Sequence, residues 1–346
     1  MKKYLFALVI LFCSSAKAIA TTYYVDSTGG SDGNAGTSTG AAWKTLLKAS
    51  TSTTAGDTIY VKSSASYNEI LFFRSTGTAT SPIRWEGYTT TPGDNGRATI
   101  EGGNTRVSCV RVNNCNYNVM LNFVLQGPTS EAIHYNDQSS NAFFFNCKIL
   151  KGSGTSPASI NSGGFADFNP TLVGCEISGF TGAGTGTGSK INPDRIEFCV
   201  IHDNTGDGIQ VNGFRQLGPV ENNIIYSNGG KGIYIAGSAT VESFYNNTIH
   251  SNTSDGIYVD GGSDTQVTIS NNVITSNGGY GINIANAPSG TTVVFTDKNF
   301  FYSNTSGEIN NTARTFPLMS NVTLTGTPYT SAGTGDYSLN NTAGAG

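Results

Sequence analysis

HDNTGDGIQV at residues 202–211 is followed by YSNGGKGIYI at 226–235, HSNTSDGIYV at 250–259 and TSNGGYGINI at 275–284. The seventh place of each copy is a glycine, which recurs every 24 or 25 residues. Apolar residues alternate with other residues after that glycine, and this is the period of a β-strand. A chain that adds short strands at a fixed period stacks them as coils about 4.8 Å apart.

Other residues recur at equivalent positions with the same period, and we call each such series a column. Together the columns predict an all-β, right-handed parallel β-helix. Asn223, Asn247 and Asn272 recur upstream of the glycines, and we expect their side-chain amides to form a ladder inside the solenoid. Glycine or asparagine occupies the turns, where we expect left-handed backbone. The pattern continues more loosely in both directions along the chain.

Cysteines replace asparagine in the earlier coils of this column. Cys147, Cys175 and Cys199 fall in register with Asn223, so we expect small buried thiols rather than a metal site. The spacing of Cys109 and Cys115 allows a disulfide but does not require one.

Composition excludes several classes of protein. Only 12% of the residues are charged and 44 of 346 are glycine, whereas average domains have about 25% and about 7%. Glycine destabilises helix interiors, so a mostly helical fold is excluded. The net charge of −4 argues against nucleic-acid or anionic-membrane partners, which favour basic surfaces.

The first twenty residues have the pattern of an export signal. Lys2 and Lys3 precede an apolar run, residues 4–12, that is too short to span a bilayer, and small residues follow at cleavage-like spacing. We therefore predict a signal peptide at residues 1–20 and a secreted, periplasmic or cell-surface product without a membrane span. After it we expect an amino-terminal cap at 21–56, the β-helix at 57–325 and a carboxyl-terminal tail at 326–346.

Five stretches near the amino terminus resemble the start of secreted β-helix proteins of the pectate-lyase superfamily, most closely polysaccharide lyase family 9. They are YYVD at 23–26, GGSDGNAGT at 29–37, AWKTL at 42–46, GDTIYV at 56–61 and YNE at 67–69. The later repeats resemble those shared by lyases, glycoside hydrolases, epimerases and viral tailspikes. Family 9 lyases use a lysine base beside a calcium site with adjacent aspartates. No Asp-Asp pair occurs in this chain, so the resemblance carries that site onto no residue here.

Both ends of the solenoid carry recognisable segments. Residues 41–49 can form one or two helical turns, in which Trp43, Leu46 and Leu47 would cover the open end of the core. GDYSL at 335–339 resembles the closing motif of such proteins. Relatives often continue past this motif, which leaves open whether the sequence is truncated.

Outward-facing residues of the repeats form three columns that we expect to share one face. If Ile225 and Ile233 point inward, their neighbours point outward. The columns are His202, Tyr226, His250 and Thr275; Gln210, Tyr234, Tyr258 and Asn283; and, at the turn, Asp207, Lys231, Asp255 and Tyr280. Tyrosine rings pack against sugars, so the predicted substrate contacts are His202, Tyr226, Tyr234, Tyr258, Gln210 and Arg215. A purely structural aromatic stack and charge ladder fits the same columns.

Two kinds of catalysis fit this face. In a lyase, Lys231 or His250 would be the base, with Arg215 or calcium neutralising a uronate carboxylate. In a hydrolase, Asp207 and Asp255 would lie about 9 to 10 Å apart, near the upper end of the inverting range. Lys231 between them would lower the pKa of either carboxyl.

Two other sets of acidic residues remain open. Glu197 and Glu221 form a closer pair one coil apart, of unknown direction. Asp26, Asp32 and Asn34 have calcium-like spacing without a full loop motif, so Ca²⁺ stays an option as a cofactor. We predict an exported protein that binds an extracellular polysaccharide and either cleaves it or does not. The rival interpretation is a non-catalytic adhesin or viral tail fibre, monomeric or trimeric.

Overall fold

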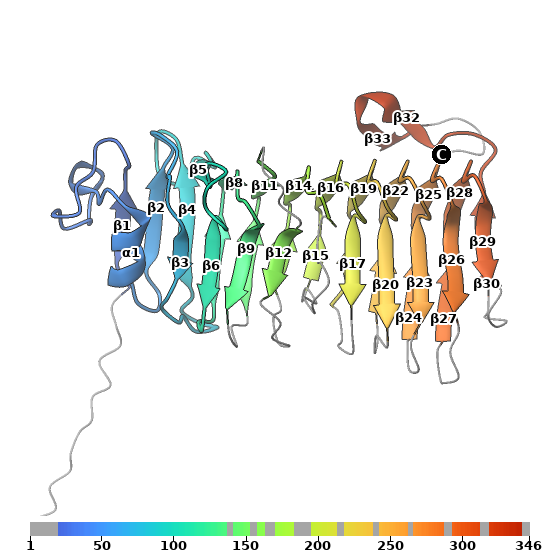
Figure 1. Ribbon diagram of the computed structural model, residues 1–346, viewed down its shortest axis with the longest axis horizontal. Coiled ribbons are helices and arrows are strands. Elements are labelled where there is room, and N and C mark those ends of the chain that lie inside the picture. The colour runs from blue at the N-terminus through green and yellow to red at the C-terminus, as the bar shows by residue number, and fades with distance from the viewer. Residues whose placement is uncertain are drawn as a thin grey trace, which may run out of the picture.

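The computed structural model describes residues 20–136, 141–152, 158–162, 170–182, 195–212, 218–237, 242–261, 266–286, 293–311 and 318–340. These residues form an elongated solenoid of stacked parallel strands with its two ends far apart (Figure 1). The described helical residues are one α-helix, α1 (Leu46–Ser52), and two short 3-10 turns, Thr39–Ala41 and Ala332–Thr334. The all-β parallel solenoid is therefore confirmed. No helix in these ranges is long and apolar enough to cross a membrane.

Three faces make up the solenoid. A twelve-stranded sheet contains β1 (Thr22–Val25), β2 (Thr58–Lys62), β4 (Ile83–Tyr88), β7 (Asn118–Leu121), β10 (Ala142–Phe145), β13 (Thr171–Val173), β15 (Arg195–Glu197), β18 (Val220–Glu221), β21 (Glu242–Tyr245), β24 (Gln266–Ser270), β27 (Val293–Asp297) and β30 (Leu318–Met319).

A ten-stranded sheet follows it in each coil from β4 onward. It contains β5 (Ala98–Glu101), β8 (Phe123–Gln126), β11 (Lys148–Leu150), β14 (Glu176–Ser178), β16 (Val200–His202), β19 (Ile224–Tyr226), β22 (Thr248–His250), β25 (Val273–Thr275), β28 (Phe300–Tyr302) and β31 (Val322–Thr323).

The third face holds two smaller sheets. The four-stranded sheet contains β3 (Leu71–Phe73), β6 (Val110–Asn113), β9 (Glu131–Asn136) and β12 (Ala158–Ser162). The five-stranded sheet contains β17 (Ile209–Asn212), β20 (Ile233–Gly237), β23 (Ile257–Gly261), β26 (Tyr280–Asn286) and β29 (Gly307–Asn311). Isoleucines of successive coils are in register and fully buried, as Ile209, Ile233 and Ile257 show.

The turn residues are explained by two different constraints. Asn222 and Asn246 have φ of 59° and 55°, the left-handed backbone expected for asparagine. The glycine column is needed for another reason, because a Cβ at Gly232 would lie 2.5 Å from Ile249 Cγ2 and 2.6 Å from the Gly256 carbonyl. Close approach between coils, rather than a positive φ, therefore selects glycine there.

The predicted asparagine ladder is present. Asn223 Nδ2 donates to Asn247 Oδ1 at 3.0 Å and to the Ile196 carbonyl at 2.9 Å, and the series continues through Asn272 and Asn299. A second ladder, which we did not predict, runs through the turn after the ten-stranded sheet: Asn204, Asn228, Asn252, Asn277 and Asn304.

The cysteine column extends the first ladder, as expected. Cys147, Cys175 and Cys199 are buried free thiols, and the Cys199 backbone N–H donates to Asn223 Oδ1 at 2.9 Å. Cys109 and Cys115 are also free, so no disulfide joins them.

The amino-terminal cap covers the end of the core with one residue different from the expected set. Trp43 and Leu46 are buried, but Leu47 is 48% exposed and Ala49 takes the inward place. The helix begins at Leu46, with four residues between it and the 3-10 turn at Thr39–Ala41, because Thr45 Oγ1 accepts the Lys48 N–H at 3.1 Å. The cap is also continuous with the solenoid, since β1 pairs in parallel with β2.

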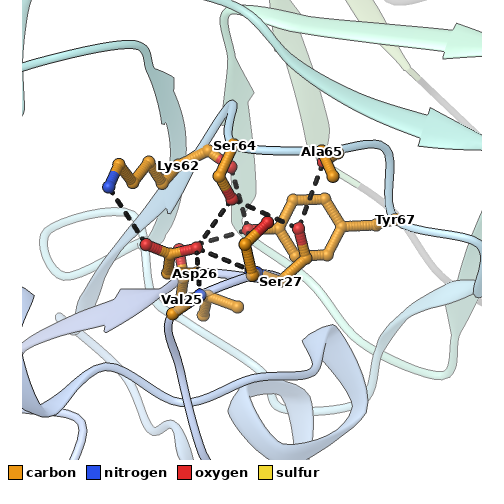
Figure 2. Close-up of polar contacts among 9 residues, drawn as sticks. Val25, Asp26, Ser27, Lys62, Ser64, Ala65 and Tyr67 are labelled. Carbon is orange, nitrogen blue, oxygen red and sulfur yellow. Dashed lines mark hydrogen bonds and ion pairs between the residues drawn. The ribbon is translucent and has the colours of Figure 1, made fainter.

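A buried carboxylate ties this cap to the first coil. Figure 2 shows Asp26 reaching the ammonium of Lys62 at 3.1 Å and the hydroxyl of Ser64 at 2.7 Å, beside the Tyr67 hydroxyl. Asp26 also accepts the N–H groups of Thr28 and Gly29, at 3.0 Å each. Burial raises the pKa of this carboxyl, but these hydrogen bonds outweigh burial and hold the pKa well below its usual range.

The carboxyl-terminal segment folds back as an antiparallel hairpin of β32 (Tyr329–Ser331) and β33 (Asp336–Leu339). Figure 1 shows it lying against the edge of the solenoid formed by β19 to β28, at the red end of the chain. Tyr329 is 2% exposed and its hydroxyl lies 3.0 Å from Thr275 Oγ1, so the hairpin is anchored on the ten-stranded sheet.

Candidate functional site

The five-stranded sheet presents the second predicted column. Gln210, Tyr234, Tyr258 and Asn283 occupy the same place in successive strands, as expected. The Tyr234 and Tyr258 rings are partly exposed, with centroids 5.5 Å apart and planes inclined by 64°. The Tyr234 hydroxyl also lies 3.4 Å from Asp260 Oδ2.

Lys231 lies at the turn before β20 and folds over these rings. Its ammonium is 4.6 Å from the Tyr234 centroid and 4.8 Å from the Tyr258 centroid, the geometry of a cation–π contact. A positive charge is thus held over two aromatic rings on an open surface. We call Lys231, Tyr234, Tyr258 and Gln210 the tyrosine face.

The two turn aspartates have structural partners. Asp207 Oδ1 accepts the Lys231 backbone N–H at 2.7 Å, and Asp255 Oδ1 accepts the Tyr280 N–H at 2.6 Å. Asp255 Oδ2 also accepts from Asn283 Nδ2 at 3.0 Å, and the residue is only 6% exposed. Each carboxylate therefore connects one coil to the next, which limits its access to a substrate.

The pKa of Asp207 moves opposite to our expectation. Burial raises it, and this outweighs the Lys231 backbone hydrogen bond and the Lys231 charge, which lower it. The reason is geometric: the lysine ammonium lies over the tyrosine rings, and no ion pair to Asp207 is found among the described residues.

The first predicted column lies on a different sheet. His202, Tyr226, His250 and Thr275 are in register on β16, β19, β22 and β25 of the ten-stranded sheet. The His202 and Tyr226 rings stack at 4.8 Å with planes 2° apart, and His202 Nδ1 lies 2.8 Å from Asp203 Oδ2. A turn separates this sheet from the five-stranded one, so the columns form two surfaces rather than the single face we predicted.

The carboxyl-terminal hairpin covers part of this first column. Tyr337 lies 5.1 Å from Tyr226 and 5.5 Å from His250, and Tyr329 lies 5.3 Å from His250, between ring centroids. Burial lowers the pKa of His250, against the opposing effect of a hydrogen bond at Thr275. Tyr329 and Tyr337 were absent from our predicted site, because nothing in their local sequence reveals which coils they contact.

The remaining candidates lie elsewhere. Glu197 and Glu221 face each other on the twelve-stranded sheet. Burial and a hydrogen bond with Glu221 raise the pKa of Glu197, and Arg195 opposes the shift from 3.0 Å. Arg215 lies outside the described residues.

The cap residues with calcium-like spacing make hydrogen bonds within the cap. Asp32 accepts the backbone N–H groups of Lys44 and Thr45 at 2.9 and 3.0 Å, and Asn34 Nδ2 donates to the Ala42 carbonyl. Among the described ranges no group of three or more His, Cys, Asp or Glu side chains has the arrangement of a metal site.

Comparison with known proteins agrees with this architecture. A family model described as a right-handed β-helix region matches residues 108–246, 220–301 and 242–341. A comparison with curated proteins found no match.

Three solved structures show the same fold. Pectate lyase Pel9A is 17% identical with a TM-score of 0.70, over 92% of this chain and 85% of that one. A rhamnogalacturonan lyase is 16% identical with a TM-score of 0.62, over 90% and 91%. A GH136 lacto-N-biosidase from Eubacterium ramulus is 12% identical with a TM-score of 0.53, over 88% and 68%. The resemblance to the pectate-lyase superfamily is thus confirmed for the fold.

Proposed function

This chain belongs to the family of right-handed β-helix proteins, and from that premise we propose that it binds an acidic extracellular polysaccharide on the tyrosine face. Aromatic rings offer flat apolar surfaces to the C–H faces of sugars, and an ammonium attracts the carboxylate of a uronic acid. The three matched solved structures are, by their names, two polysaccharide lyases and a glycosidase, which supports a carbohydrate ligand here.

The observation that carries the proposal is the position of Lys231. Its ammonium lies 4.6 to 4.8 Å from two tyrosine centroids instead of pairing with the neighbouring turn carboxylates. The rings hold the charge in place without neutralising it, so it stays available for an anionic ligand. Amide groups of Gln210 and Asn283 continue the column on either side of the tyrosines.

The turn aspartates fit a binding surface better than a hydrolytic pair. Both carboxylate oxygens of Asp255 accept hydrogen bonds, from the Tyr280 N–H and from Asn283 Nδ2, so we assign Asp255 to the scaffold. Asp207, whose pKa is raised, sits next to Lys231 and is the carboxyl best placed to contact a bound sugar.

Binding is tested with a matched pair of polymers. Purified protein is titrated calorimetrically with polygalacturonate and with its highly methyl-esterified form, which has the same backbone and little charge. We expect tighter binding of the charged form, weakening in high salt because the Lys231 charge is screened. Lys231→Gln should weaken binding of the charged form about fivefold, and Tyr258→Ala should weaken both about tenfold.

Lys298→Gln is the control, since Lys298 is an exposed lysine in the turn between β27 and β28. Equal losses in Lys298→Gln and Lys231→Gln, or no binding of any acidic polymer in a wider panel, would overturn the proposal. The same samples are assayed for reducing ends and for ultraviolet absorbance of unsaturated uronates. Both signals together identify a lyase, and reducing ends alone identify a hydrolase. Binding without either signal is the behaviour expected of an adhesin.

Export is part of the proposal. Residues 1–19 lie outside the described residues, and the structure begins at Ala20, immediately before β1. Expression of the full chain with amino-terminal sequencing of the exported product tests it. We expect the mature chain to start near Ile19 or Thr21, whereas an uncleaved, cell-retained product would contradict export.

A further inference from the structure

The carboxyl-terminal hairpin and the ten-stranded sheet form the walls of a half-open cavity of about 480 Å³. From the sheet it is lined by Tyr226, Ser227, His250 and Ser251, and from the hairpin by residues 332–335 and Tyr337. Ligand pockets typically measure about 300–1,000 Å³, so this cavity is large enough for a small ligand. It lies on the other side of the turn from the tyrosine face.

The walls of the cavity are held in place by the protein itself. The Tyr337 ring contacts both Tyr226 and His250, and Tyr329 packs edge-on against Tyr337 with centroids 5.3 Å apart. The hydrogen bond between the hydroxyls of Tyr329 and Thr275 fixes the hairpin beside them. A site whose walls are already ordered loses little entropy when a ligand enters.

The polar groups of the lining suit hydroxylated ligands. Within the described part of the chain, the hydroxyls of Tyr226, Ser227 and Tyr337 have no protein hydrogen-bond partner, so they remain free for a ligand. His250 is fixed at both nitrogens, by Thr275 Oγ1 at 2.9 Å and Ser251 Oγ at 2.8 Å. The exposed parts of three rings therefore supply apolar contacts, while three hydroxyls supply hydrogen bonds.

The charge around the cavity favours a neutral ligand. Among the described residues that line it there is no Asp, Glu, Lys or Arg, so no cation attracts an anionic sugar. The Asp203 carboxylate lies close enough to add to burial in raising the pKa of Tyr226, whereas the nearby Glu176 is paired with Lys148 at 2.6 Å. The Asp203 charge repels an anionic sugar. We propose that this cavity is a second carbohydrate site, which binds a neutral sugar unit against the exposed parts of Tyr226, His250 and Tyr337. It goes beyond the proposed function, because its ligand and its residues are both different.

The test uses ligand-observed NMR and calorimetry on the whole chain with glucose, galactose, rhamnose, cellobiose and lactose, against glucuronic and galacturonic acids. We expect millimolar binding of at least one neutral sugar and weaker binding of its acid counterpart. Tyr226→Ala removes one wall of the cavity, and Ala332→Trp fills the cavity. Each variant should weaken neutral-sugar binding at least tenfold.

Matched variants separate this site from the tyrosine face. Tyr245→Ala, which removes an outward tyrosine of the twelve-stranded sheet, and Tyr258→Ala, which removes a ring of the tyrosine face, should leave the binding of these small neutral sugars unchanged. Tyr226→Phe keeps the ring and loses the hydroxyl, so it should give a smaller loss with an unchanged melting temperature. No neutral sugar bound at about 50 mM, or equal loss in Tyr245→Ala, would overturn the site. Acidic-polymer binding that weakens in Lys231→Gln and Tyr258→Ala but not in Tyr226→Ala would leave the proposed function intact.

Discussion

Asparagine side chains satisfy the polar backbone at two corners of every later coil. Each amide in the ladders donates to a neighbouring asparagine and to a main-chain carbonyl, and its oxygen accepts a backbone N–H. Buried polar groups are costly when unpaired, so a side chain with both donors and an acceptor suits a tight buried corner.

We predict that Asn247→Ala lowers the free energy of unfolding by about 2–4 kcal/mol, because it leaves several buried groups without partners. The Val220 carbonyl and the Asn223 backbone N–H lose the amide that they bind, and Asn223 Nδ2 and Asn272 Oδ1 each lose one of their hydrogen bonds. Urea unfolding followed by circular dichroism measures the change. Ser243→Ala, on the outward side of β21, is the control and should stay within about 0.5 kcal/mol of wild type. A loss below about 1 kcal/mol for Asn247→Ala would contradict the ladder's contribution.

Cys199 is the last cysteine of the column that continues as the Asn223 ladder. Its side chain makes a contact equivalent to one that the asparagines of this ladder make. Its Sγ approaches the Leu172 carbonyl, the contact that Asn223 Nδ2 makes with Ile196 one coil later. Asn223 Oδ1 already accepts the Cys199 backbone N–H and keeps one lone pair. We predict that Cys199→Asn extends the ladder and raises the free energy of unfolding by about 0.5–1.5 kcal/mol. Cys199→Leu, which is larger and cannot hydrogen-bond, should be destabilised, and the reverse order would contradict the prediction.

The cap and the hairpin are the elements that depart from the repeat, and each is fastened by polar anchors. The cap uses Asp26 and the hairpin uses Tyr329, both buried. The repeat period gives no information about either segment, so their packing had to be seen in the structure. This explains why we placed Leu47 in the core although it is exposed, and why Tyr329 and Tyr337 were missing from the predicted site.

The cap should weaken in acid. The pKa of Asp26 is lower in the folded chain than the value of about 3.9 expected when unfolded, so unfolding takes up a proton as the pH falls. The stabilisation is fully present above about pH 4 and is lost below it. Trp43, whose carbonyl accepts the Asp26 N–H, is a local reporter for fluorescence-detected urea unfolding. We expect Asp26→Asn to be less stable at pH 6 and to lose less stability between pH 5 and pH 3. Equal pH slopes in both proteins would exclude this role.

The solenoid as a whole decides which predicted residues can act together. Coils stack in register, so residues one period apart are neighbours, and the columns His202–Tyr226–His250 and Gln210–Tyr234–Tyr258 were predictable. The repeat period of the sequence does not specify the angle at which the ten-stranded and five-stranded sheets meet. This angle places these columns on different surfaces, one open and one beneath the hairpin.

Repetition let the sequence by itself determine the parallel β-helix, the buried isoleucines, the Asn223 ladder and the buried thiols of its cysteine continuation. Stacking makes each of these a local rule between one coil and the next, so a period of 24 or 25 residues is sufficient information. Only the tertiary structure decided that the Lys231 ammonium lies over two tyrosine rings, that the pKa of Asp207 is raised, and that the hairpin covers Tyr226 and His250. Those outcomes depend on burial and on contacts between segments far apart in sequence, such as Thr275 and Tyr329, which no period relates.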